Sequence, residues 1–198
     1  MATAPDTNPS PEANLIRYVI DPRKGSFTAQ AFATGMLSAF GHSPRIAIRE
    51  FSGEARFAQS GTSIESAPLQ LTVQARSLEV TDDIREKDRQ EIHRQMYEEV
   101  LETNRFPEIT YECSRASASG SGDSYWVALN GELTLHGVLR PLAISARVVV
   151  SGDSLRASGE FMVSQSDFEI APVKVAGGAL KLKDEVKITF DIVARKQE

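Results

Sequence analysis

The sequence predicts an all-β protein, built as a barrel or a sandwich of antiparallel strands with one amphipathic helix. Apolar and polar residues alternate along most of the chain, and this period of two is typical of strands with one buried face. Only one stretch has the spacing of an amphipathic helix. Strands that share an apolar face, with so little helix to cover it, bury that face by closing the sheet or by packing two sheets together.

In the N-terminal part, residues 17–20 and 26–33 read as two strands separated by a turn. Residues 45–57 read as one long strand in which the apolar residues change sides, so we expect a bulge or a bend near Glu50. Further alternation over residues 69–76 predicts the next strand.

The helix is predicted over residues 89–101. Apolar side chains recur there at helical spacing, at Ile92, Met96 and Val100. Asp88 and Glu91 fit the N-cap and N3 positions of a capping box, and Pro107 stops the helix before the next strand. Such a helix either plugs or flanks one end of a barrel, or forms a mobile lid over a cavity.

The clearest strands form a hairpin over residues 125–150, with its turn at residues 136–141. Leu129, Leu133 and Leu135 share one face of the first strand, whereas His136 has the parity of the polar residues and is expected to face outward. The alternation continues over residues 155–161 and 180–192.

Composition excludes several classes of protein. A chain of 198 residues with 41% hydrophobic residues suits one β domain, and a net charge of −5 without a basic stripe argues against nucleic acid as a partner. The single cysteine, Cys113, excludes an intramolecular disulfide and a cysteine-rich metal site, and it reads as a buried strand residue.

Residues 1–14 are rich in Ala, Thr, Pro, Asn and Ser, and are expected to form a disordered tail. They contain neither the basic segment nor the apolar segment of a signal peptide, and no later run is long enough to span a membrane. These features predict a cytoplasmic protein, or a periplasmic one if a leader has been removed.

Several motifs occur in an order that resembles the YceI-like family. They are Tyr18-Val19-Ile20-Asp21-Pro22, Phe51-Ser52-Gly53, Arg105-Phe106-Pro107-Glu108-Ile109, Gly131-Glu132-Leu133-Thr134-Leu135-His136-Gly137-Val138 with Arg140-Pro141, and Gly159-Glu160-Phe161 through Ser166-Asp167-Phe168. The resemblance implies one lipocalin-like antiparallel barrel of about eight strands over residues 15–197. It also implies binding of polyisoprenoids or other long-chain amphiphiles.

An eight-stranded barrel is either filled by its own side chains or holds one small ligand. The inward positions expected to line a cavity, and so to bind the ligand, are Leu71, Val73, Leu133, Ile144, Val148, Phe161, Leu182, Ile188 and Phe190. Small residues expected among them, which would leave room, are Ala29, Ala31, Ala75, Ala146, Ala157 and Gly159.

Candidates for contact with a ligand head group are His42, Arg140 and Lys174, which lie in or near conspicuous turns. Lys181 and Lys183 alternate with leucines and are expected on the solvated outer face. The three histidines are too far apart in the sequence for a local metal signature.

No nucleophile elbow, phosphate-binding glycine loop or histidine pair is present, and adjacent carboxylates such as Asp82-Asp83 are usually solvated. We therefore expect neither catalysis nor a cofactor. The predicted function is binding, storage or transport of a polyisoprenoid, an isoprenoid quinone or a fatty amide. The alternative is a filled barrel that acts as a protein-interaction or stress-associated module. A homodimer is compatible with either reading.

Overall fold

The computed structural model describes residues 15–34, 43–60, 63–65, 68–175 and 180–197; the predicted N-terminal tail lies outside these residues. The strands of the barrel are β1 (Ile16–Ile20), β2 (Ser26–Thr34), β3 (Arg45–Ile48), β4 (Phe51–Ser60), β6 (Leu69–Gln74), β7 (Leu78–Val80), β8 (Glu108–Ser121), β9 (Ser124–Leu135), β10 (Val138–Ser151), β11 (Ser154–Ser164) and β13 (Leu180–Gln197). Two short strands, β5 (Ser63–Glu65) and β12 (Lys174–Val175), pair with β4 and β13.

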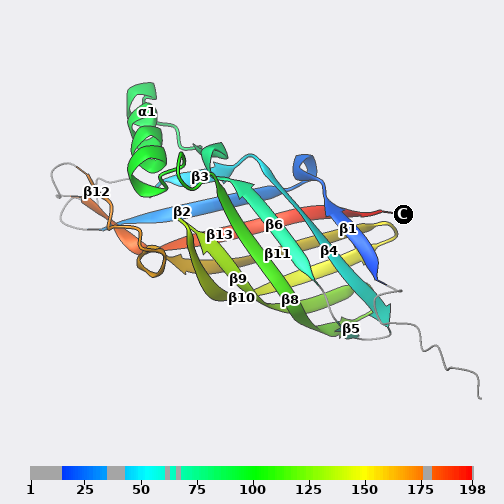
Figure 1. Ribbon diagram of the computed structural model, residues 1–198. Helices are drawn as coiled ribbons and strands as arrows, with labels where there is room; N and C mark the ends of the chain where they lie inside the picture. Colours follow the sequence, from blue (N-terminus) through cyan, green and yellow to red (C-terminus); the bar gives the residue numbers. More distant parts are fainter. Residues whose placement is uncertain (1–14, 35–42, 61–62, 66–67, 176–179, 198) are drawn as a thin grey trace, which may run out of the picture.

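These strands close into an eight-stranded antiparallel barrel, as the resemblance implied (Figure 1). The hydrogen-bonded order is β1-β4-β6-β8-β9-β10-β11-β13, and β13 pairs with β1 to close the ring. Three positions in the ring are each occupied by two consecutive strands, namely β1 with β2, β3 with β4, and β6 with β7. The long β13 pairs with both β1 and β2, so it aligns these two strands, which share one position in the ring.

The prediction of one continuous strand over residues 45–57 was wrong, although the irregularity lies where it was expected. The chain leaves the ladder at Arg49 and Glu50, between β3 and β4. The amide of Arg49 donates to the carbonyl of Ser77, and the carbonyl of Glu50 accepts from the amide of Gln74. The break is therefore fixed by the matching break between β6 and β7, where a short 3-10 turn covers Ala75–Ser77.

The helix begins earlier than the sequence predicted. Helix α1 spans Glu86–Gln95 and continues as a π-helical turn over Met96–Val100, with the amide of Leu101 bonded to the carbonyl of Met96. Arg85 occupies the N-cap position and makes no capping bond through its side chain, so the predicted capping box was wrong. Asp88 lies inside the first turn instead, where its carboxylate accepts a 2.8 Å bond from Nε of Arg85.

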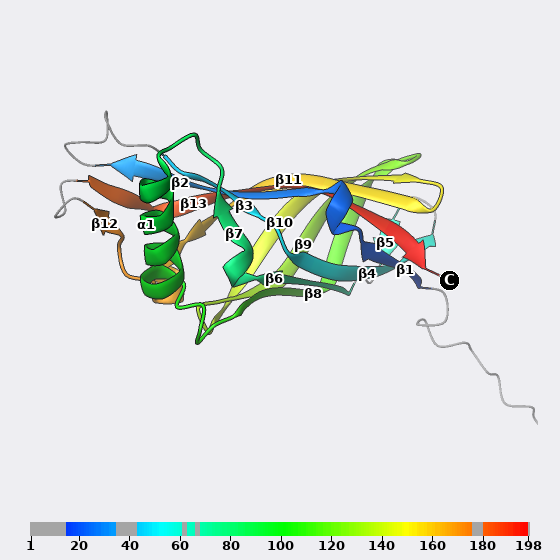
Figure 2. The same cartoon turned by 90° about the horizontal axis from the view of Figure 1, so that it is seen from above.

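Helix α1 lies at one end of the barrel, as predicted (Figures 1 and 2). It packs against β7 and covers its outer edge. Strand β8 begins opposite Gln74, the last residue of β6, so β7 has a strand partner, β3, on one side only. On its other side, Arg89 donates to the carbonyl of Val80 at 2.7 Å, and the hydroxyl of Tyr97 donates to the carbonyl of Leu78 at 2.5 Å. Two residues about two helical turns apart thus satisfy backbone groups that a neighbouring strand would otherwise pair.

The β9–β10 turn brings the motif that contains Gly137 into contact with the motif that contains Phe106. His136 and Gly137 both have positive φ, 53° and 73°, and connect the paired residues Leu135 and Val138. The ring of Phe106 lies so close to Gly137 that an added Cβ would meet it at 2.5 Å. The phenylalanine of one motif therefore requires the glycine of the other.

Candidate functional site

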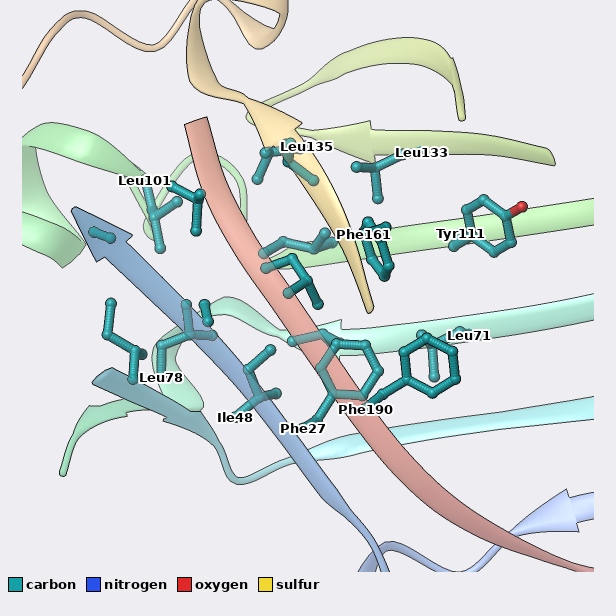
Figure 3. A pocket seen from close by; sticks show the side chains of 18 of the residues that line it. Phe27, Ile48, Leu71, Leu78, Leu101, Tyr111, Leu133, Leu135, Phe161 and Phe190 are labelled. Atoms are coloured by element: carbon teal, nitrogen blue, oxygen red, sulfur yellow. The ribbon is translucent and has the colours of Figure 1, made fainter. Parts of the chain in front are cut away.

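The barrel encloses a cavity of about 820 Å³ (Figure 3). This volume falls within the range of roughly 300–1,000 Å³ found for small-molecule sites. The walls come from every strand of the ring and from α1, and apart from a few polar groups they are aliphatic or aromatic. The inside of the barrel is hollow, so it can accommodate an apolar guest.

All nine side chains that the sequence placed on the inner wall line this cavity. They are Leu71, Val73, Leu133, Ile144, Val148, Phe161, Leu182, Ile188 and Phe190. Their alternation along the strands is the reason that the sequence could place them. Their contact with a ligand remains a prediction.

Only four of the six small residues expected in the cavity wall are found there. Ala29, Ala31, Ala146 and Ala157 line the cavity. Gly159 does not, because the ring of Phe190 already occupies the space above it: a Cβ on Gly159 would lie 2.8 Å from Cζ of Phe190. Ala75 is also absent from the wall, since it belongs to the 3-10 turn after β6. These two positions leave no room for a ligand.

The cavity is elongated. Its lining residues on β10 run from Leu142 to Val148, and on β13 from Leu182 to Ala194. At about 3.3 Å per residue, the β13 positions extend over roughly 40 Å of strand. Because the strands of a barrel are tilted, the cavity itself is shorter than this, but it suits a linear molecule better than a compact one.

Helix α1 and the π-helical turn that follows it supply part of the wall; the sequence predicted a helix at a barrel end or over a cavity but did not assign its residues to the lining. The apolar side chains that identified the helix, Ile92, Met96 and Val100, line the cavity beside Leu78 and Val80 of β7. The same stripe was visible in the sequence, but periodicity alone does not say which surface an apolar face covers. The helix is therefore both a cover for β7 and one side of the cavity.

The mouth of the cavity is polar and lies where β7 leads into α1. Its residues, here called the mouth residues, are Asp82, Asp83, Arg85 and Asp88. Asp83 and Arg85 are exposed, so the cavity reaches solvent at this point. The sequence treated the Asp82-Asp83 pair as an ordinary solvated pair, because nothing local indicates that a cavity opens beside it.

The interior is uncharged around its buried tyrosine. Tyr111 (Figure 3) is 4% exposed and packs so closely on Gly131 that an added Cβ would meet its Cζ at 2.6 Å; its hydroxyl donates to the carbonyl of Leu142 at 3.1 Å. Burial, and to a smaller extent the nearby Cys113, raises the pKa of this hydroxyl above its ordinary value, so it stays protonated. Cys113 is itself a buried strand residue, as predicted.

Outside the mouth, Glu54 is the one acidic residue that borders the cavity among the described residues, and its carboxylate is paired with exposed arginines on the outer face of the barrel. Glu54 accepts bonds from Arg17 at 2.8 Å and from Arg56 at 2.8 Å. The hydrogen bond from Arg17 is the main reason that the pKa of Glu54 is lowered. The carboxylate thus remains ionised beside its two guanidinium partners.

The structure does not assemble the three predicted head-group residues into one site. His42 lies outside the described residues, and Lys174 is described only as part of the backbone of β12. Arg140 is exposed, donates to the carbonyl of its neighbour Leu139 at 3.1 Å, and is not part of the cavity wall. As expected, Lys181 and Lys183 are exposed.

The expected outward orientation of His136 was wrong. Its side chain is only 13% exposed, with Nδ1 3.2 Å from the carbonyl of Phe168 and the ring in an edge contact with Phe106. The positive φ of His136 rotates the side chain away from the direction that strand parity predicts. His136 therefore links the turn to two neighbouring segments.

Within the described residues, no group of three or more His, Cys, Asp or Glu side chains is arranged to hold a metal ion. Over the same part of the chain, no helix is both long enough and apolar enough to cross a membrane.

A closed eight-stranded antiparallel barrel around an apolar cavity defines the class of lipocalin-like barrels. The model of the YceI-like domain matches residues 18–194, and the chain belongs to this family. A UPF0312 protein of Shewanella baltica strain OS185 is 31% identical over 141 residues, which are 71% of this chain and 66% of that protein. A UPF0312 protein of Shewanella oneidensis is 29% identical over 136 residues, or 68% of this chain and 63% of that protein. The match thus spans slightly less than two thirds of these relatives.

Solved structures share the fold. Burkholderia cenocepacia BcnA superposes with a TM-score of 0.67 at 19% identity, over 88% of this chain and 98% of its own. A polyisoprenoid binding domain from Saccharophagus degradans gives a TM-score of 0.62 at 14% identity, over 91% and 98% of the two chains. The YCEI protein of Campylobacter jejuni gives 0.57 at 13% identity, over 77% and 85%.

Proposed function

We propose that this protein binds one long-chain amphiphile in its barrel, for storage or transport, and performs no chemistry on it. The polyisoprenoids, isoprenoid quinones and fatty amides are the ligand classes that fit. The observation that carries the proposal is the elongated apolar cavity of about 820 Å³ that reaches solvent at a polar mouth. Family membership and the polyisoprenoid-binding neighbour support a binding role.

The energetics are sufficient without many polar contacts. Burial of about ten methylene groups, at roughly 0.8 kcal/mol each, contributes about 8 kcal/mol, which corresponds to micromolar affinity. The alternative of a filled barrel that serves as an interaction module is disfavoured, because the inner side chains leave the central space open.

The first experiment is native mass spectrometry of freshly purified protein, followed by organic extraction and mass analysis of what is released. A stoichiometric isoprenoid or acyl species supports the proposal. A bare protein mass, together with no thermal shift on addition of prenyl alcohols, quinones or fatty amides, contradicts it.

A matched pair of variants tests whether the ligand binds inside the barrel. Ala146 lines the cavity on β10, whereas Ala128 lies exposed on the neighbouring β9. We expect Ala146→Phe to weaken binding at least roughly tenfold, because the ring takes up ligand space. Ala128→Phe, the same substitution on the outer face, is expected to leave binding unchanged. Equal loss, or no loss, in both variants contradicts an internal site.

A further inference from the structure

The charges at the cavity mouth bear on which head group the ligand carries. Four charged side chains line the cavity at this point, and three of them are carboxylates. Among the described residues that line the whole cavity, Arg85 is the only one with a basic side chain. Its guanidinium is already engaged, since Nε donates to the carboxylate of Asp88 at 2.8 Å.

The other two mouth carboxylates have no cation paired with them through their side chains in the described structure. Oδ2 of Asp82 accepts the backbone amide of Arg45 at 2.7 Å, which fixes its position without neutralising its charge. Asp83 follows directly and is exposed. Arg89 is close, but its guanidinium donates to the backbone carbonyls of Val80 and Asp82, and its Nε lies 3.5 Å from Glu86.

The side chains that line the mouth therefore carry an excess of negative charge, while the wall behind them is mainly hydrocarbon. An amphiphile that enters tail first leaves its head group beside Asp82 and Asp83. A phosphate or carboxylate head would be repelled by these groups and would find no free cation among the described residues of the wall. An alcohol, amide or quinone head avoids the repulsion, and an ammonium head is attracted.

On these grounds we infer that the cavity selects amphiphiles with an uncharged or positively charged head group and discriminates against anionic ones. The inference rests on the proposed function and specifies its ligand class. At the mouth, which is in contact with solvent, we expect discrimination of roughly tenfold, equivalent to about 1.4 kcal/mol. Because the groups are exposed, this selectivity should diminish as the salt concentration rises.

The test uses probes that share one tail: hexadecylamine, hexadecanol and hexadecyl phosphate. The amine and the phosphate are titrated below their micelle concentrations and the alcohol below its solubility limit, at neutral pH and low salt. The protein is loaded with a neutral naphthylamine dye, and displacement is followed by fluorescence. We expect the amine and the alcohol to displace the dye at concentrations roughly tenfold lower than the phosphate requires. If the phosphate binds as tightly as the alcohol, the inference is overturned.

Charge-removing variants locate the effect. In Asp82→Asn/Asp83→Asn the difference between alcohol and phosphate should shrink, whereas Asp123→Asn/Asp153→Asn, in the β8–β9 and β10–β11 turns, should keep it. If the first variant melts early because Asp82 holds Arg45, Asp83→Asn alone gives the same readout. Unchanged selectivity after loss of the mouth charges also overturns the inference.

The two proposals fail in distinguishable ways. If the three probes bind equally, the barrel is a carrier without the inferred selectivity, and the proposed function stands. If neither the dye nor any of the three probes binds, the proposed function fails, and the head-group inference fails with it.

Discussion

Nε2 of His93 accepts the backbone amide of Val80 at 2.9 Å, so a helical side chain takes the place of a neighbouring strand at the edge of β7. The ring of His93 also stacks on Tyr97, with centroids 5.6 Å apart. Together with the bonds from Arg89 and Tyr97 to the same edge, this contact fastens α1 to the barrel.

Replacement of His93 by Phe should loosen this attachment. The ring stacking can persist, but the amide of Val80 loses its acceptor, at a cost of about 1–3 kcal/mol for a buried donor left unpaired. We expect faster hydrogen exchange at Val80 and along α1. Gln90→Ala, which changes an exposed residue bonded to Glu86 within the helix, is the control and should leave the exchange of Val80 unaffected. Unaltered exchange in His93→Phe would mean that the helix is held by its apolar face alone.

Gly137→Ala should destabilise the barrel through a steric clash. The new Cβ would lie 2.5 Å from the ring of Phe106 at a φ of +73°, so we expect about 2–3 kcal/mol from clash and backbone strain together. Gly152→Ala has a similar φ of +56° but meets nothing within 4 Å, and should cost only about 1 kcal/mol. Denaturant unfolding of both variants measures the difference, and equal losses would show that the contact with Phe106 is unimportant.

The stability of the barrel should fall at acidic pH, in part through Asp191. Its carboxylate accepts 2.7 Å and 2.5 Å bonds from Arg156 on the adjacent β11, and these bonds lower its pKa below the ordinary value of 3.8. Because the folded state favours the ionised form, the stabilisation is present above pH 3.8 and is lost as the pH falls through the lowered pKa.

In Asp191→Asn this contribution is absent at every pH. The free energy of unfolding of the variant should therefore be lower near neutrality and should approach that of the unsubstituted protein under strongly acidic conditions. Thermal melts over a pH series make the comparison. A constant gap between the two proteins down to the lowest pH would rule out the ion pair as its source.

The sequence predicted the barrel wall better than the cavity mouth, for a physical reason. Along strands such as β10 and β13, a period of two fixes which residues face inward, so Ile144, Val148 and Ile188 could be placed without a structure. The mouth residues are brought to the cavity by the path of a connection and by the docking of α1. Their position depends on contacts between distant segments, such as that of Asp82 with Arg45, and these leave no local pattern.

Errors at other positions arose where backbone geometry departs from the regular pattern. The burial of His136 between neighbouring segments could not be read from parity, because the residue sits in a turn at positive φ. The start of α1 was misplaced because Asp88 pairs with Arg85 rather than capping the helix. The room expected at Gly159 was absent, since a large side chain from the neighbouring strand, Phe190, fills it.

Because β6 and β7 are separate strands, the helix docks on the edge of β7 and lies outside the hydrogen-bonded ring. The register of the whole ring is set by backbone pairs in which no residue of α1 takes part. Substitutions at exposed positions of α1 that keep its bonds to β7 can therefore change the opening without altering the strand pairs. One scaffold can in this way acquire openings of different width and polarity while its interior wall stays the same.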